Sequence, residues 1–186
     1  MIDFSISNDE YQNDLAELIR PFESRTDENI SLAVEYQNQE GVFKIQITSN
    51  KFDGFVKNYA FKIDTDGELE RKRVEKRYLK IAIYRTLSFL LNVNLPYGCL
   101  TGIRPTKLYC EIENDKDRYS KSAHDVFLKD YSVSEGKVEL IEKIVSVQKP
   151  IRNKSSRQYD VFVFIPFCPT RCAYCSFVSL PIDKQR

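Results

Sequence analysis

The chain has 186 residues, of which 42% are hydrophobic and 30% charged, and its formal net charge is +1 at pH 7. This composition is typical of a soluble globular protein, and the length suffices for one domain and part of another. The near-neutral charge gives no general attraction to nucleic acid or anionic membranes, and the polar start and the absence of long apolar runs exclude a signal peptide and a spanning helix. We therefore expect a cytoplasmic protein with reduced cysteines and with neither a membrane nor a nucleic acid as its partner.

The first 64 residues predict one strand, a short helix and three further strands. Residues 1–7 have strand character, and Asn8 or Asp9 can cap a helix that ends at Pro21. Apolar and polar residues alternate in three later stretches, and the short Gly-containing segments between these stretches favour antiparallel hairpins. These three predicted strands are residues 29–37, 41–49 and 55–64.

Helices are expected to dominate residues 68–149. The longest, at 68–92, is charged in its first turns and apolar nearly all round in its second half, so its C-terminal end should be buried. After a Pro/Gly loop, Pro105 is placed to begin a short helix. Two more helices are predicted at 122–131 and at 134–149, the latter capped by Ser134 and ended by Pro150.

These elements predict two domains of different kinds. Residues 1–150 are expected to form an α+β accessory domain with a small antiparallel sheet and several helices. The polar residues 151–158 read as a linker. Residues 159–166 are apolar on both faces, which is typical of a parallel strand buried between two layers. Functional loops of α/β sheets and barrels follow the carboxyl ends of such strands.

Three of the five cysteines come directly after this predicted strand. Cys168, Cys172 and Cys175 have the spacing C-x3-C-x2-C. A structural zinc site usually takes four ligands in paired spacings, whereas the other two cysteines and the sole histidine, His124, lie in a different region. An iron–sulfur cluster that is held by three thiolates, with one iron left open, needs no fourth protein ligand. The spacing therefore fits an iron–sulfur site better than zinc.

Two segments add a resemblance to a known family. The stretch "IPFCPTRCAYCSF" resembles the cluster loop of the radical S-adenosylmethionine superfamily, and its "IPFC" start is similar to the oxygen-independent coproporphyrinogen III oxidases. Upstream, "LPYGCLTGIRPTK" resembles an N-terminal segment of the coproporphyrinogen dehydrogenase branch. The resemblance implies that residues 159–186 are the first strand and cluster loop of a truncated α/β radical enzyme barrel. A chain of this length is then expected to be inactive by itself.

The resemblance also implies roles for individual residues. Cys168, Cys172 and Cys175 would hold three irons of a 4Fe-4S cluster, whose open iron binds S-adenosylmethionine. Tyr174 would lie near the adenine of that cofactor, and Phe162 would also contact the cofactor. Phe162 stands where many relatives carry tyrosine, and two residues later a phenylalanine stands where they carry histidine.

The family reaction is the oxidative decarboxylation of coproporphyrinogen III propionates to vinyl groups in haem biosynthesis. The expected partners are this tetrapyrrole and an electron donor such as flavodoxin or ferredoxin. Two alternatives remain open, namely a haem-binding carrier of the same superfamily and an RNA-modifying enzyme whose N-terminal domain binds RNA.

Arg104 and Lys107 form a second candidate site in the upstream segment. A structural interpretation has Arg104 bonding to loop carbonyls where a helix begins. A functional interpretation has both cations contacting either a propionate of the tetrapyrrole or the rest of the barrel. The planar guanidinium suits a propionate, because it donates two parallel hydrogen bonds to a carboxylate. The basic run at 71–80 has a similar pair of interpretations, as a solvated helix face or as a phosphate-binding surface.

Overall fold

The structure is a computed structural model that describes residues 1–65, 67–115, 119, 121–152, 161–169 and 180–181. The chain divides into two compact units, Met1–Pro150 and Ile151–Arg186. The predicted linker at 151–158 lies almost entirely outside the described residues, so the predicted domain limits stay a prediction.

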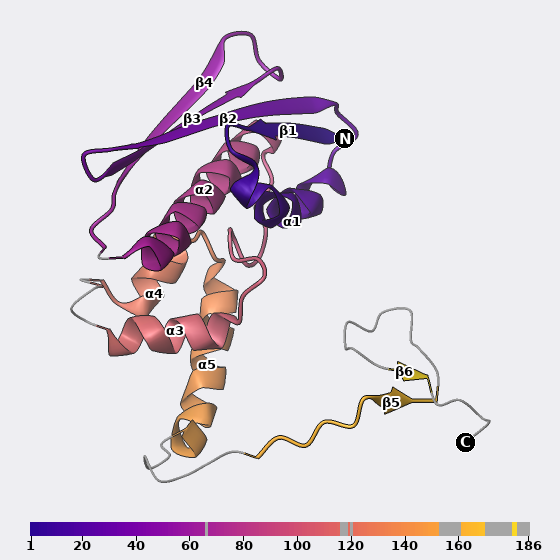
Figure 1. The fold of residues 1–186 in the computed structure, drawn as a ribbon, viewed down its shortest axis with the longest axis vertical. Helices are drawn as coiled ribbons and strands as arrows, with labels where there is room; N and C mark the ends of the chain where they lie inside the picture. The colour runs from indigo at the N-terminus through magenta and orange to yellow at the C-terminus, as the bar shows by residue number, and fades with distance from the viewer. Residues whose placement is uncertain (66, 116–118, 120, 153–160, 170–179, 182–186) are drawn as a thin grey trace. The chain divides into compact units, whose positions relative to one another are not determined.

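The first unit is built on a four-stranded sheet with the strand order β1-β2-β3-β4 (Figure 1). β2, β3 and β4 pair antiparallel, as the sequence predicts, but β1 runs parallel to β2. The expected antiparallel sheet is therefore a mixed sheet. Parallel neighbours need a crossover connection, which the helix α1 supplies between β1 and β2. The bounds are β1 (Ile2–Ile6), α1 (Gln12–Glu23), β2 (Ile30–Gln39), β3 (Val42–Ser49) and β4 (Phe55–Lys62).

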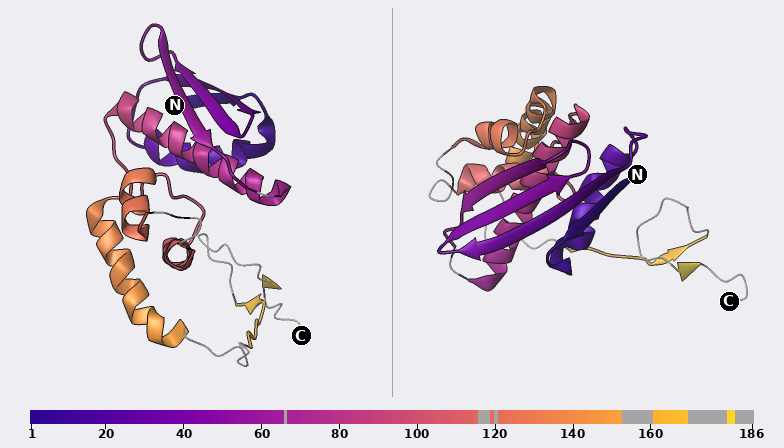
Figure 2. Two further views of the ribbon diagram at one scale, coloured as in Figure 1. Left: turned by 90° about the vertical axis from the view of Figure 1, so that its left-hand side faces the viewer. Right: turned by 90° about the horizontal axis from the view of Figure 1, so that it is seen from above.

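One face of this sheet forms the core. Alternate residues of the two central strands are buried there, among them Val34, Phe43 and Ile47, as period-2 patterning requires. The helices α1 and α2 (Glu68–Leu91) cover this face, and the opposite face stays open (Figures 1 and 2). The second half of α2 is buried almost all round, as predicted, whereas its first turns are charged.

The first helix extends beyond its predicted end. A short 3-10 turn, η1 (Asp9–Tyr11), precedes α1, and Pro21 lies inside α1 instead of ending it. Proline removes one intrahelical hydrogen bond, but Phe22 directly after it is fully buried in the core. Burial of this large side chain offsets the lost bond and continues the helix to Glu23.

Three further helices form a group on the side of α1 and α2 that faces away from the sheet (Figure 2). The helix predicted at 122–131 is present in two parts, of which the second is π-helical. The helix α5 runs past its predicted end, and Pro150 lies inside it. The bounds are α3 (Pro105–Asn114), α4 (Ala123–Asp125), η2 (Val126–Asp130) and α5 (Glu135–Arg152). Within the described ranges, no helix combines the length and the apolarity that crossing a bilayer requires.

In the second unit, the predicted strand at 159–166 is not formed where the structure describes it. Val161–Pro166 have no strand pairing, and the side chains of Val161 and Phe162 are each 87% exposed. Two short strands, β5 (Phe167–Cys168) and β6 (Leu180–Pro181), pair in parallel just after this segment. A strand with two apolar faces needs neighbouring strands and covering layers, and the described part of this unit offers only β6. The barrel stays a prediction.

Candidate functional site

Cys168 is the member of the cysteine motif that the structure describes. It ends β5 as a free, half-buried thiol. Cys172, Tyr174 and Cys175 lie outside the described residues. Within the described ranges, no three His, Cys, Asp or Glu side chains gather as metal ligands, and that search includes Cys168 alone of the motif.

The donor set of this motif fits an iron–sulfur cluster. Three thiols lie within eight residues of sequence, and the described one is neither fully buried nor in a disulfide. Soft sulfur ligands select iron–sulfur clusters or zinc, and three of them leave one iron of a 4Fe-4S cluster open.

Phe162 is exposed, and its ring stacks on that of Phe164 with centroids 6.3 Å apart. Both rings therefore lie on one side of the chain.

The loop between α2 and α3 is anchored on both of its sides. The amide of Leu95 donates to the Tyr84 hydroxyl at 3.1 Å, and the amide of Cys99 donates to the Tyr131 carbonyl at 3.0 Å. Burial raises the pKa of the Cys99 thiol to about 12. Cys99 is therefore a structural residue of the core and not a reactive thiol.

Lys80 fixes the next part of this loop. Its ammonium donates to the Thr101 carbonyl at 3.2 Å and to the Thr101 hydroxyl at 3.1 Å, with Asp14 at 3.8 Å. Burial lowers the pKa of Lys80 despite the attraction of Asp14. The amine thus positions the backbone three residues before Arg104.

Arg104 and Lys107 lie at the exposed start of α3. The Arg104 carbonyl accepts hydrogen bonds from the amides of Lys107 and Leu108, and Pro105 occupies the first turn as predicted. Lys107 pairs with Glu111 at 3.5 Å in a largely exposed ion pair. The Arg104 guanidinium has no hydrogen-bond or ion-pair partner among the described residues. The structural interpretation, in which Arg104 binds loop carbonyls, therefore has no support in this part of the chain.

The first unit also contains a cleft of about 430 Å³ that no sequence pattern predicts. It lies between the end of β4, the helix α2 and the η2 segment, and we call it the α2–η2 cleft. Its wall includes four aromatic and four cationic side chains. Among them are Phe61, Arg77, Tyr78, Arg85, Lys121 and Tyr131. The signal in the sequence is a pair of arginines eight residues apart on one helix, but only the tertiary structure brings the aromatic residues beside them.

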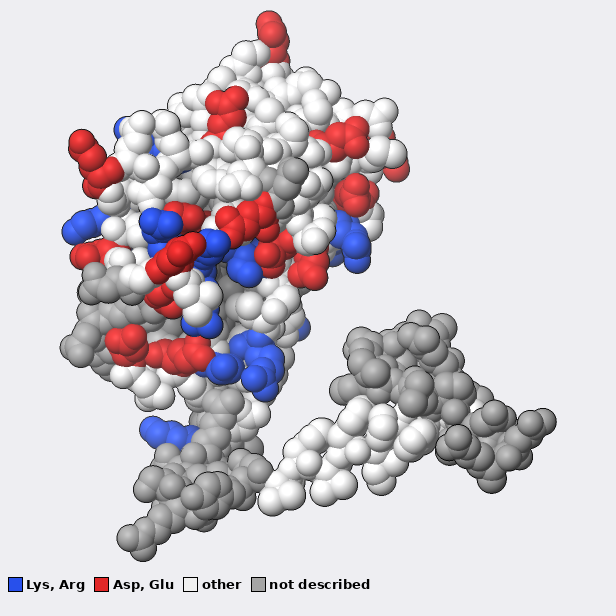
Figure 3. Space-filling view, in the orientation of Figure 1, with Lys and Arg blue, Asp and Glu red and all other residues white. Residues whose placement is uncertain are grey.

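The first part of the basic run at 71–80 behaves as a solvated helix face. Most of its cations pair with carboxylates of their own helix or of the N-terminal segment; for example, Lys72 lies 2.9 Å from Glu10 and Lys76 lies 3.4 Å from Asp14. Two cations of the run differ, since Arg77 lines the α2–η2 cleft and Lys80 is buried. On the face shown in Figure 3, Lys and Arg are interspersed with Asp and Glu. Mixed charges of this kind do not form the continuous basic surface that nucleic-acid binding uses.

Comparison with known proteins gives one informative similarity. No established family profile and no solved structure matches the chain significantly. The chain is similar to the oxygen-independent coproporphyrinogen-III oxidase-like protein HemZ of Bacillus subtilis (strain 168), with 31% identity over 122 residues. This similarity supports a relationship between the chain and the coproporphyrinogen-III oxidase-like family. The match covers 63% of the chain and 24% of HemZ, so the chain spans about a quarter of the length of this relative.

Proposed function

We propose that the chain is the N-terminal part of a radical S-adenosylmethionine oxidoreductase that decarboxylates the propionates of a coproporphyrinogen-like tetrapyrrole. The observation that carries this proposal is the C-x3-C-x2-C motif in a chain that is 31% identical to HemZ over 122 residues. The motif supplies the chemistry, and the similarity favours the substrate class.

In this proposal the cysteine thiolates are the metal ligands. Cys168, Cys172 and Cys175 bind three irons of a 4Fe-4S cluster, and Tyr174 and Phe162 contact S-adenosylmethionine. When bound, the cluster and S-adenosylmethionine supply the radical chemistry that removes a hydrogen atom from the substrate.

Arg104 is proposed to bind a propionate carboxylate. Its guanidinium is exposed and has no partner in the described part of the chain, while Pro105 and the Lys80–Thr101 contacts fix the backbone around it. A planar guanidinium on a fixed backbone, with no partner among the described residues, suits bidentate binding of a carboxylate. Lys107 adds a second positive charge one helical turn away.

A turnover assay tests this function on a chain extended to the length of HemZ. With a one-electron reductant, S-adenosylmethionine and coproporphyrinogen III under anaerobic conditions, we expect release of carbon dioxide and formation of vinyl groups. The substitution Arg104→Lys should raise the KM for the tetrapyrrole and leave the thermal stability unchanged, because the guanidinium makes no hydrogen bond or ion pair with the described residues. A chain with an intact cluster that binds haem but releases no carbon dioxide would instead be a carrier.

A further inference from the structure

The α2–η2 cleft has the size and the lining of a small-molecule site. Its volume of about 430 Å³ falls in the range of roughly 300–1,000 Å³ that is usual for such sites. One part of its wall is aromatic, since Phe61 stacks on Tyr78 with centroids 4.3 Å apart. Another part carries the guanidinium groups of Arg77 and Arg85, which both project from α2.

Arg77 places a partly buried positive charge in the wall of the cleft. Its guanidinium donates to the Tyr119 hydroxyl at 2.9 Å and lies over the Tyr131 ring, 5.9 Å from the centroid. Burial opposes the charge, but the surroundings, which include Tyr131, Tyr119 and Glu70, outweigh it and raise the pKa of Arg77. Arg77 is therefore a charged group whose direct contacts in the described structure are a hydroxyl and an aromatic ring. A partly buried guanidinium whose direct contacts in the described structure include no carboxylate can bind an anion.

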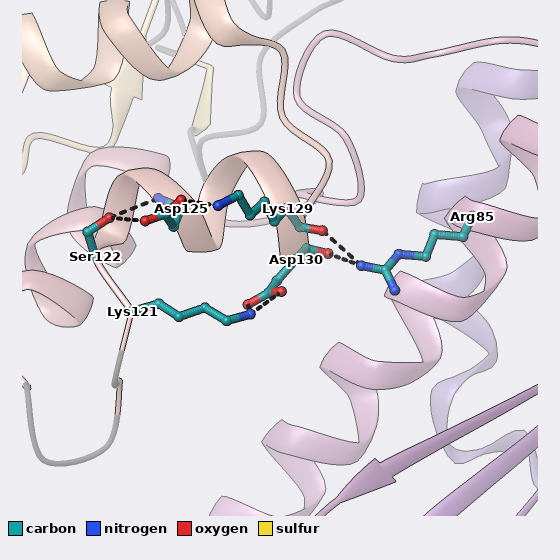
Figure 4. Close-up of polar contacts among 6 residues, drawn as sticks. All are labelled: Arg85, Lys121, Ser122, Asp125, Lys129 and Asp130. Carbon is teal, nitrogen blue, oxygen red and sulfur yellow. Dashed lines mark hydrogen bonds and ion pairs between the residues drawn. The ribbon is translucent and has the colours of Figure 1, made fainter.

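Arg85 is held in place by neutral acceptors (Figure 4). Its guanidinium donates to the carbonyls of Lys129 and Asp130, at 2.9 and 3.3 Å. The Asp130 carboxylate instead binds Lys121, at 2.9 and 3.1 Å. The two backbone bonds fix the orientation of Arg85 without neutralising its charge, and its other N–H groups have no acceptor among the described residues. Such a preorganised donor binds an anion at a low cost in conformational entropy.

We propose that the α2–η2 cleft binds a small organic anion with an aromatic body. Its carboxylate or phosphate group is bound by Arg77 and Arg85, and its ring lies against the aromatic wall at Phe61 and Tyr78. The guanidinium fork matches both kinds of anion. The cleft volume suits one ring or two fused rings, so this ligand is distinct from the tetrapyrrole substrate.

Titration of the isotopically labelled chain, followed by the backbone amide signals in two-dimensional NMR, tests this site. The probes are phenyl phosphate and benzoate, which share a ring and differ in the anion. We expect saturable shifts at the amides of Arg85, Lys121 and Tyr131 with at least one of them. Phenol, which lacks the charge, and inorganic phosphate, which lacks the ring, should each bind about tenfold more weakly. Stronger binding of phenyl phosphate would assign a phosphate as the anionic group of the ligand, and stronger binding of benzoate would assign a carboxylate.

Two variants and a control decide the role of the arginines. Arg85→Gln and Arg77→Gln should each weaken the better probe by about tenfold, whereas Arg20→Gln on α1 should leave its affinity unchanged. The spectrum of each variant outside the cleft shows whether it is folded. Shifts that do not saturate, equal affinity for phenol, or unchanged affinity in both arginine variants would overturn the proposal. If neither variant folds, the affinity of the parent chain for phenol relative to the charged probes still tests the proposal.

Discussion

Gly98 is the residue at which the anchored loop tolerates the least change. Its φ of 55° is in the left-handed region, and a Cβ atom there would lie 1.9 Å from the Tyr131 carbonyl oxygen and 2.6 Å from the Ser132 carbonyl carbon. Both neighbours are backbone atoms that cannot rotate away. The requirement for glycine at this position is therefore steric as well as conformational.

Gly98→Ala should lower the free energy of unfolding by roughly 3 kcal/mol, because the loop must move away from η2 and α5. Urea unfolding followed by circular dichroism measures this change. Gly54→Ala is the matched control, since Gly54 has a φ of 65° but nothing within 4 Å of the added atom. It should cost only about 1 kcal/mol of backbone strain. Equal losses in the two variants would show that the close approach at Gly98 is unimportant.

Lys80 gives a prediction for alkaline pH. Its pKa is lowered in the folded chain, mainly by burial, so the unfolded chain binds more protons between that lowered value and the ordinary value of 10.5. The contribution of Lys80 to the free energy of unfolding must therefore rise with pH across this window. Cys99, whose pKa is raised to about 12, contributes in the opposite direction, so a difference between variants is needed.

The difference between the parent chain and Lys80→Met in urea unfolding should shift in favour of the parent as the pH rises toward 10.5. Lys44→Met on the open face of the sheet serves as the control, and its difference from the parent should stay flat. A flat difference for Lys80→Met as well would contradict the burial argument.

At the scale of elements, one polar cluster joins α3, α4 and α5. Glu142 of α5 accepts a hydrogen bond from the Tyr109 hydroxyl at 2.8 Å, and it lies 2.8 Å from the Nδ1 atom of His124. Burial pushes its pKa upward, but the bonds to His124 and Tyr109 outweigh this and hold the pKa of Glu142 below its usual range. The stabilisation is present above the ordinary value of 4.5 and is lost as the pH falls through the lowered value.

Glu142→Gln should accordingly lower the free energy of unfolding at pH 7 by about 1 kcal/mol or less, since the cluster is partly exposed. The loss should shrink as the pH of the same unfolding measurements falls below 4.5 and through the lowered pKa of Glu142, where the carboxyl group of the folded parent chain becomes protonated. Glu139→Gln on the same helix is the control and should have little effect at either pH. A loss for Glu142→Gln that persists unchanged in acid would show that the ionised carboxylate is unimportant.

The elements of the first unit could mostly be predicted from the sequence, because their patterns are local. Alternation marks β2, β3 and β4, and the charged and apolar halves of α2 follow from its composition. The parallel pairing of β1 could not be predicted, because it depends on how α1 packs under the sheet. Tertiary packing also decides whether a proline ends a helix. At Pro21 the burial of Phe22 outweighs the lost hydrogen bond, so the helix continues.

The candidate sites also differ in whether a local sequence pattern could predict them. The cysteine motif lies within eight residues and could be found from spacing alone. Only the structure shows that the guanidinium of Arg104 has no partner among the described residues, since the sequence allowed bonds to loop carbonyls equally well. The α2–η2 cleft is assembled from segments up to 70 residues apart, from Phe61 to Tyr131, so no local pattern reveals it.

At the scale of the whole molecule, the chain combines a well-formed α+β unit with a segment that carries the C-x3-C-x2-C motif. Similarity to HemZ extends over 63% of the chain, and the second unit, Ile151–Arg186, is too short to contain most of that match. The first unit is thus part of what the chain shares with this relative. In this account the unit holds Arg104 for substrate contact, and the cysteine segment supplies the metal ligands.

The most direct test of this account is anaerobic reconstitution of the chain with iron and sulfide, followed by EPR of the reduced sample with and without S-adenosylmethionine. We predict about four irons per chain and a spectrum that changes when S-adenosylmethionine is added. Cys168→Ser should lose this signal, and Cys110→Ser, outside the motif, should keep it. Stoichiometric zinc binding without iron uptake, or equal iron uptake by the parent chain and Cys168→Ser, would contradict the radical enzyme assignment.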